Sequence, residues 1–177
     1  MEPGEKIKDQ GSKVKGKINK EQKTAKPPRI LAVCRSEEKG TKKKPGNEGV
    51  LRENYGLMKD AHACSEGHRQ VSLLAMESIV KMMKLGYPVG PGVFAENLTT
   101  EGIDLCSLPV STRLSIGKDI VLEVTQIGKE CHTGCAVMRE TGKCIMPKEG
   151  VFARVIQGGK VQAGDRIKIV KSMPCKP

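Results

Sequence analysis

The sequence predicts a mainly β fold, a barrel or sandwich of short strands with one or a few short helices. Short runs of apolar and β-branched residues recur at close spacing, most densely in the last third of the chain, and turns rich in glycine separate them. Only residues 76–85 place apolar side chains at clear helical spacing. The long alternation of strand and helix that builds a parallel nucleotide-binding sheet is absent, which excludes that class.

The predicted elements follow in chain order. Residues 37–46 form a polar loop between the first two strands, and residues 56–67 are irregular and polar. The helix over residues 76–85 ends at Gly86, and Pro88 follows just beyond. The predicted strands cover residues 29–34, 48–53, 71–74, 93–100, 112–116, 119–127, 151–156, 160–162 and 166–170.

The positive charge gathers in the N-terminal quarter of the chain. Residues 1–44 hold 14 Lys or Arg and 6 Asp or Glu, a net of +8, whereas residues 45–177 hold 17 and 14, a net of +3. We therefore expect a disordered basic tail over 1–28, one β domain over 29–171 and a flexible C-terminus over 172–177. A small nucleic-acid-binding barrel that uses this tail is one alternative. It is disfavoured because two Tyr, two Phe and no Trp leave little for base stacking.

Cysteine usage indicates a reducing compartment. Seven cysteines, an odd number, occur without a secretory signal or a membrane-spanning apolar run, so we expect a cytoplasmic protein with reduced thiols and no membrane partner. Cys131, His132 and Cys135 gather three of the ten thiol and imidazole groups within five residues. We interpret the remaining isolated cysteines as small core residues, namely Cys34, Cys64, Cys106 and Cys175.

The cysteine cluster allows two kinds of chemistry. With Cys144 it could form a structural Cys3His zinc site, although its spacing is not that of a standard finger or ribbon. Alternatively, one cysteine is a lone reactive or metal-binding thiolate, because Lys129 precedes Cys131 by two residues and a nearby cation favours the thiolate. Molybdenum accepts such a soft ligand together with a dithiolene cofactor.

Two further polar groups are candidates for ligand binding. Asp60 and His62 could orient one another, and Arg69 is suited to phosphate, although a surface loop is the better interpretation from residue types alone. Asn97 is out of place in a predicted strand that is otherwise apolar. Its amide could read a heterocycle edge, or it could form an Asx turn at the end of the strand.

Several motifs together resemble the MOSC domain, the C-terminal module of molybdenum cofactor sulfurases that small bacterial proteins also carry alone. The resemblance extends over about residues 29–170. It implies a MOSC-type β-barrel that binds molybdenum cofactor, or transfers sulfur to it, through a single cysteine. The segments that carry it are 56–62, 91–104, 108–109, 113–117, 121–131 and 150–165.

The resemblance implies that the functional cysteine follows a strand a few residues after a Gln. Cys131 has that spacing from Gln126, so it is the first candidate for both the reactive thiol and the molybdenum ligand, and Cys135 is the second. The chain would then be either a reductase-like component or a sulfur carrier. The first role would need an electron-donor protein, since no flavin or haem motif is present, and the second would need a sulfur-donor protein.

The resemblance also implies the residues beside the cofactor. Asn97 and Thr99 lie in the motif that accompanies the cofactor, and His62 matches a D-x-H motif. Together with Arg69 they are the expected cofactor-binding residues. The chain departs from the family pattern where many members have glycine or proline, at Lys59, Ala95 and Glu130.

Overall fold

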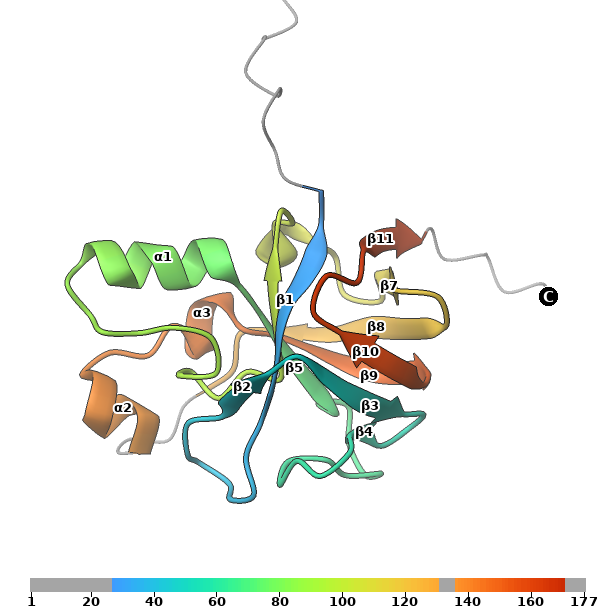
Figure 1. The fold of residues 1–177 in the computed structure, drawn as a ribbon, viewed down its shortest axis with the longest axis horizontal. Helices are drawn as coiled ribbons and strands as arrows, with labels where there is room; N and C mark the ends of the chain where they lie inside the picture. The colour runs from blue at the N-terminus through green and yellow to red at the C-terminus, as the bar shows by residue number, and fades with distance from the viewer. Residues whose placement is uncertain (1–26, 131–135, 171–177) are drawn as a thin grey trace, which may run out of the picture.

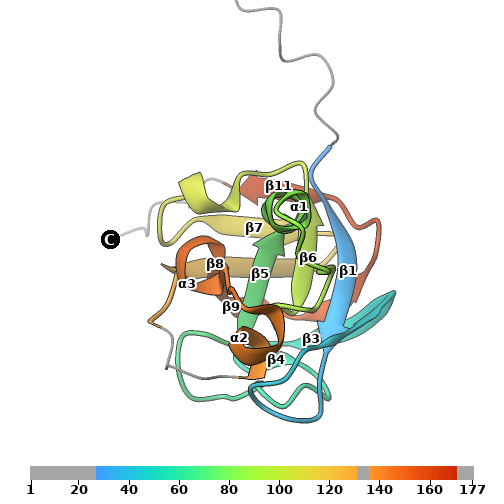
Figure 2. The same ribbon diagram turned by 90° about the vertical axis from the view of Figure 1, so that its left-hand side faces the viewer.

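The computed structural model describes residues 27–130 and 136–170, and in them the chain is mainly β with few helices, as predicted. The strands are β1 (Arg29–Arg35), β2 (Lys44–Gly46), β3 (Glu48–Arg52), β4 (Gly56–Leu57), β5 (Val71–Ala75), β6 (Leu98–Glu101), β7 (Arg113–Ile116), β8 (Ile120–Ile127), β9 (Val151–Gln157), β10 (Gly159–Gln162) and β11 (Ile167–Val170). The helices are α1 (Met76–Lys84), α2 (Ala136–Thr141) and α3 (Met146–Glu149), with a 3-10 turn over Leu105–Ser107. Figures 1 and 2 show the three helices together on one side of the strands.

Two sheets organise the strands. Eight of them follow the order β11-β7-β8-β9-β5-β6-β1-β2, and β10, β3 and β4 form a smaller sheet. Only the β5–β6 pair is parallel among the described ladders. Over the described residues the large sheet is not closed into the expected barrel. β1 nevertheless contacts the turn before β11, since the Ile30 N–H donates to the Asp165 carbonyl at 2.8 Å and the Gly164 N–H donates to the Ile30 carbonyl at 2.8 Å.

Aliphatic side chains form the interior, as the scarcity of aromatic residues predicts. In β8, Ile120, Leu122 and Val124 are buried while the residues between them are partly exposed, the alternation expected of a strand with one face on the core. A second core cluster lies around α1, α2 and α3 and contains both phenylalanines, Phe94 and Phe152. That cluster forms the apolar floor of the candidate site.

The predicted strand over residues 93–100 is only half correct. Its first half is a turn, and β6 begins at Leu98. Gly92 and Ala95 have φ of +82° and +64°, in the left-handed region that an extended strand cannot contain. The Glu96 carboxyl accepts the Gly92 N–H at 2.6 Å and so closes the turn.

Several short elements were not predicted, among them β4, which begins the segment expected to be irregular, and the 3-10 turn. β2 lies within the expected loop over residues 37–46, and α2 and α3 are too short to show a helical period in the sequence. None of the helices in the described ranges is long and apolar enough to cross a membrane. The division into a tail, one domain and a C-terminal segment stays a prediction.

Candidate functional site

A cavity of about 220 Å³ brings together three of the four predicted cofactor-binding residues, His62, Arg69 and Asn97. They come from the loop after β4, the approach to β5 and the turn before β6. Side chains of the second core cluster and the end of β8 complete the wall. The remaining lining residues are Ser72, Phe94, Ala95, Lys129, Met146 and Phe152.

Two cations lie over one aromatic ring at this cavity. The Arg69 guanidinium carbon is 5.8 Å and the Lys129 Nζ 5.9 Å from the centroid of the Phe152 ring. Contacts of this length are cation–π interactions, which hold a cation in place without neutralising it. Among the described residues, neither cation forms an ion pair with a carboxylate. The pair can therefore receive an anionic group of a ligand.

Most of the hydrogen-bonding groups of the Asn97 side chain are bonded to other residues of the protein. Its Oδ1 accepts both the N–H and the hydroxyl of Ser72, at 3.1 and 3.0 Å, and its Nδ2 donates to the Cys34 carbonyl at 3.4 Å. These bonds tie the turn before β6 to both β5 and β1. One Nδ2 hydrogen remains for a hydrogen bond to a ligand, so the main role of Asn97 is to hold the backbone around the cavity in place.

Thr99 does not line the cavity. It is fully buried, and its hydroxyl donates to Glu96 Oε1 at 2.8 Å and lies 3.8 Å from the Cys34 sulfur. Burial, reinforced by the nearby Glu96, raises the pKa of the Cys34 thiol to about 12. Cys34 is thus the small core residue that the sequence predicts, and a thiol in this setting is not a nucleophile.

Glu96 was not predicted as a buried group. Its side chain is inaccessible to solvent, and burial raises the pKa of its carboxyl although hydrogen bonds from Gly92 and Thr99 act in the opposite direction. Its Oε2 has no hydrogen-bond partner among the described residues. Glu96 therefore acts inside the turn that carries Phe94, Ala95 and Asn97 to the cavity.

Asp60 connects the His62 loop with the segment after β1. Its carboxylate accepts the Lys43 ammonium at 2.6 Å and the backbone N–H groups of Ser36 at 3.0 Å and His62 at 3.1 Å. His62 Nδ1 lies 3.6 Å from Asp60 Oδ1. Burial alone would raise the pKa of Asp60, but the contacts with His62, Lys43 and Ser36 outweigh it and hold that pKa well below its usual range.

The exit of β8 is fixed by four hydrogen bonds. Gln126 Nε2 donates to the Gly128 carbonyl at 2.7 Å, and Gln126 Oε1 lies 2.9 Å from His68 Nε2. The Gly128 N–H donates to Gly150 at 2.7 Å, and that of Lys129 to Pro147 at 3.2 Å. Gly128 has a φ of +67°, and a Cβ there would lie 2.4 Å from the Pro147 carbonyl oxygen. Only glycine fits this close approach.

The predicted functional cysteines, Cys131 and Cys135, lie outside the described residues, as does His132. The zinc alternative stays a hypothesis for the same reason, since only its fourth member, Cys144, is described. One cysteine prediction is wrong: Cys64 is exposed rather than buried, because the polar loop that carries it lies at the surface. Its sulfur accepts the Glu66 N–H at 3.3 Å.

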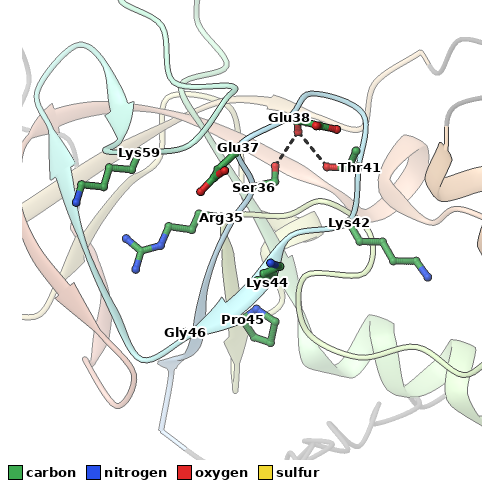
Figure 3. A pocket seen from close by; sticks show the side chains of 10 residues that line it. All are labelled: Arg35, Ser36, Glu37, Glu38, Thr41, Lys42, Lys44, Pro45, Gly46 and Lys59. Atoms are coloured by element: carbon green, nitrogen blue, oxygen red, sulfur yellow. Dashed lines mark hydrogen bonds between the residues drawn. The ribbon is translucent and has the colours of Figure 1, made fainter.

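A second, larger cavity of about 630 Å³ is lined by Lys59 and by the segment from the end of β1 through β2, and sequence reasoning did not anticipate it. Figure 3 shows Arg35 and Lys59 extending to the same side of this cavity, with the Glu37 carboxylate beside them. Lys59 adopts a φ of +63°, so a position where glycine would be unstrained holds a lysine. Cations outnumber carboxylates among the residues that line this cavity, but in the described part of the chain none of these cations lies over an aromatic ring.

Comparison with known proteins agrees with this architecture. A family model described as the MOSC domain matches residues 40–168. The YuaD protein from Bacillus subtilis is similar in structure with a TM-score of 0.67 at 18% identity, over 81% of this chain and 96% of that one. YiiM from Geobacillus stearothermophilus reaches 0.61 at 18% identity over 82% and 76% of the two chains. YiiM from Escherichia coli reaches 0.58 at 20% identity over 82% and 71%. No curated protein sequence matches the chain.

Proposed function

Because the chain belongs to the MOSC domain family, which is generally associated with molybdenum cofactor sulfurase-like function, we propose that its smaller cavity binds molybdenum cofactor. The observation that carries this proposal is the pair of cations, Arg69 and Lys129, over the Phe152 ring. Molybdenum cofactor bears a phosphate group, and guanidinium and ammonium groups are the usual protein partners of phosphate. The Asn97 amide and the His62 ring supply polar contacts beside them.

The size of the cavity supports binding of one part of the cofactor. Sites that enclose a whole small molecule usually measure about 300–1,000 Å³. The smaller cavity measures about 220 Å³, and Lys129 is one of its lining residues. Arg69 and Lys129 would hold the phosphate, and the remainder of the cofactor would extend beyond these residues.

Cys131 is the proposed partner of the cofactor's metal or sulfur. It lies outside the described residues, and in the sequence it follows Lys129, which lines the cavity, by two positions. When bound, the cofactor supplies a metal that accepts a thiolate ligand and exchanges electrons. The Cys131 thiolate would either ligate that metal in a reductase component served by an electron donor, or carry a persulfide sulfur received from a donor protein. Cys135 is the second candidate for either role.

Metal analysis of the full chain purified from a molybdate-fed host tests the proposal. We expect near-stoichiometric molybdenum, lost in Cys131→Ser and retained in Cys64→Ser, which removes an exposed cysteine elsewhere. Arg69→Gln should lower the molybdenum content, because the phosphate loses one of its two cations. Zinc in place of molybdenum, lost on replacing Cys131, Cys135 or Cys144, would contradict the proposal.

The two roles of Cys131 differ in a second measurement. A persulfide releases its outer sulfur to cyanide as thiocyanate, whereas a metal-ligating thiolate does not. Thiocyanate that disappears in Cys131→Ser would support sulfur carriage. Molybdenum without releasable sulfur would support the reductase component.

A further inference from the structure

The His62 side chain has one buried ring nitrogen and is otherwise partly exposed to solvent. Its Nδ1 is buried and makes no hydrogen bond among the described residues, while the side chain as a whole is 38% exposed and lines the smaller cavity. Asp60 Oδ1 lies 3.6 Å from that nitrogen. A closure of about 0.6 Å would complete a hydrogen bond of normal length. Catalytic contacts of this kind often tighten only when a ligand binds.

Asp60 is a fixed anion behind His62. Its side chain and that of Lys43 are each 1% exposed, and their polar atoms are 2.6 Å apart. The Ser36 N–H binds the second carboxylate oxygen, so the carboxylate cannot rotate away from the ring. Lys43 balances the Asp60 charge, which lets Asp60 orient the imidazole without requiring the imidazole itself to be charged.

We propose that His62 is a proton-transfer residue of this cavity, that Asp60 and Lys43 are its positioning residues, and that it acts on an anionic ligand held by Arg69 and Lys129. Asp60 selects the tautomer with the proton on Nδ1, which leaves the Nε2 lone pair toward the accessible side. Nε2 then accepts a proton from an N–H, O–H or S–H group of the ligand.

The transfer is balanced within the site. The imidazolium that forms pairs with Asp60, and the ligand gains one negative charge beside the two cations. Return of the proton restores both partners, so no other bond changes and no oxidant is needed. The charged groups around His62 are Asp60 on its own loop, Lys43 behind it, Arg69 before β5 and Lys129 after β8. The inference rests on the proposed function only for the identity of the ligand.

Nitrogen-15 NMR of the full chain tests the tautomer directly, with His68 as an internal reference. Gln126 donates its Nε2 hydrogen to Gly128 and so turns its Oε1 toward His68, which must donate from Nε2. We therefore expect opposite tautomers, Nδ1–H in His62 and Nε2–H in His68. The signals of the third histidine, His132, are identified because they are missing from the spectrum of the His132→Gln variant. Nε2–H in His62 of the unsubstituted protein would overturn the proposal.

Two variants separate positioning from folding. Asp60→Asn replaces the carboxylate by an amide of the same shape, so His62 should shift toward the Nε2–H tautomer while His68 stays unchanged. Gln126→Leu should change His68 and leave His62 as it is. A His62 tautomer that persists in folded Asp60→Asn would refute the role of Asp60. If that variant does not fold, the unsubstituted spectrum decides alone.

Inorganic phosphate serves as the anionic probe. Its addition should shift the His62 ring signal to saturation, and Arg69→Gln should weaken that response about two- to fivefold, the effect of one exposed charge. Arg52→Gln is the matched control, because Arg52 lies 5.4 Å from the Tyr55 ring in the same kind of contact outside the cavity. No phosphate response at His62, or equal weakening by both variants, would overturn the ligand assignment. If the protein contains molybdenum but His62 is not in the Nδ1–H tautomer, only the inference about His62 is refuted. If His62 is in that tautomer but the protein contains no molybdenum, only the proposed function is refuted.

Discussion

Replacing Lys43 by Met tests how the interior beside the cavity is held together. The Lys43 and Asp60 side chains are each 1% exposed and form an ion pair of 2.6 Å. Met is unbranched and of similar length, so the substitution removes the charge and keeps most of the packed volume. Asp60 would then retain the N–H groups of Ser36 and His62 as donors, but no buried cation.

The expected loss is large because one buried charge is left behind. Removing one partner of a buried ion pair costs about 3–5 kcal/mol, against a total stability of about 5–15 kcal/mol for a domain. Lys160→Met is the matched control. Lys160 and Glu48 form a pair of 2.8 Å, but their side chains are 60% and 61% exposed, and such pairs contribute about 0–1 kcal/mol.

The same substitution should change the acid limb of stability. Burial alone raises the pKa of Asp60, but its polar contacts hold that pKa below the usual range in the folded protein. A lowered folded pKa adds stability above the unfolded value of about 3.9, and this stability is lost as the pH falls from there toward the folded pKa. Without Lys43, the pKa of Asp60 in the folded protein rises toward or above its unfolded value, so Lys43→Met should lose less stability between pH 7 and pH 3 than the unsubstituted protein.

Urea unfolding between pH 7 and pH 3 measures both effects. Asp60→Leu should also be strongly destabilising, since it leaves the Lys43 ammonium buried alone. The double variant Lys43→Met with Asp60→Leu should be more stable than either single variant, because no buried charge remains. A loss in Lys43→Met no larger than that in Lys160→Met, or a double variant as unstable as the sum of the singles, would refute the reasoning.

Three further outcomes follow from single positions. Ala95→Gly should raise the free energy of unfolding by up to about 1 kcal/mol, because Ala95 has a φ of +64°, whereas Ala153→Gly in strand β9 should lower it. Gly128→Ala should lower it by at least about 1 kcal/mol, since its Cβ would meet the Pro147 carbonyl oxygen at 2.4 Å, and it should also reduce the molybdenum content. Cys34 should resist iodoacetamide at pH 8 in the native protein, because its pKa is raised from 9.0 to about 12. The raised pKa stabilises the fold below pH 9, and this stabilisation is lost as the pH rises toward 12. The free energy of urea unfolding should therefore fall less steeply between pH 9 and pH 12 in Cys34→Ala than in the unsubstituted protein.

The sequence predicts the strands well where one face is buried. In β8 apolar and β-branched residues predict the strand, and Ile120, Leu122 and Val124 are buried while the residues between them are partly exposed, so the sequence and the structure agree. The cavity was also partly predictable. His62 and Arg69 were singled out as polar groups suited to a ligand, and Asn97 as an amide in an apolar run, and all three line the smaller cavity.

Residues 92–97 show why the rest was not predictable. Val93, Phe94 and Leu98 fit a strand pattern, and that pattern gives no sign of the left-handed conformations at Gly92 and Ala95. Those conformations depend on the buried Glu96 carboxyl, whose partners are set by tertiary contacts.

The same limit applies to the three consecutive lysines at the start of β2. Lys42, Lys43 and Lys44 are chemically alike, yet only Lys43 turns inward, because only it reaches Asp60. Asn97 is likewise drawn into the protein by Ser72 and Cys34, although its residue type alone suggests a ligand contact. Of the described residues that line the smaller cavity, Arg69 and Lys129 form no ion pair with a carboxylate, and they are therefore better placed than Asn97 to contact a ligand.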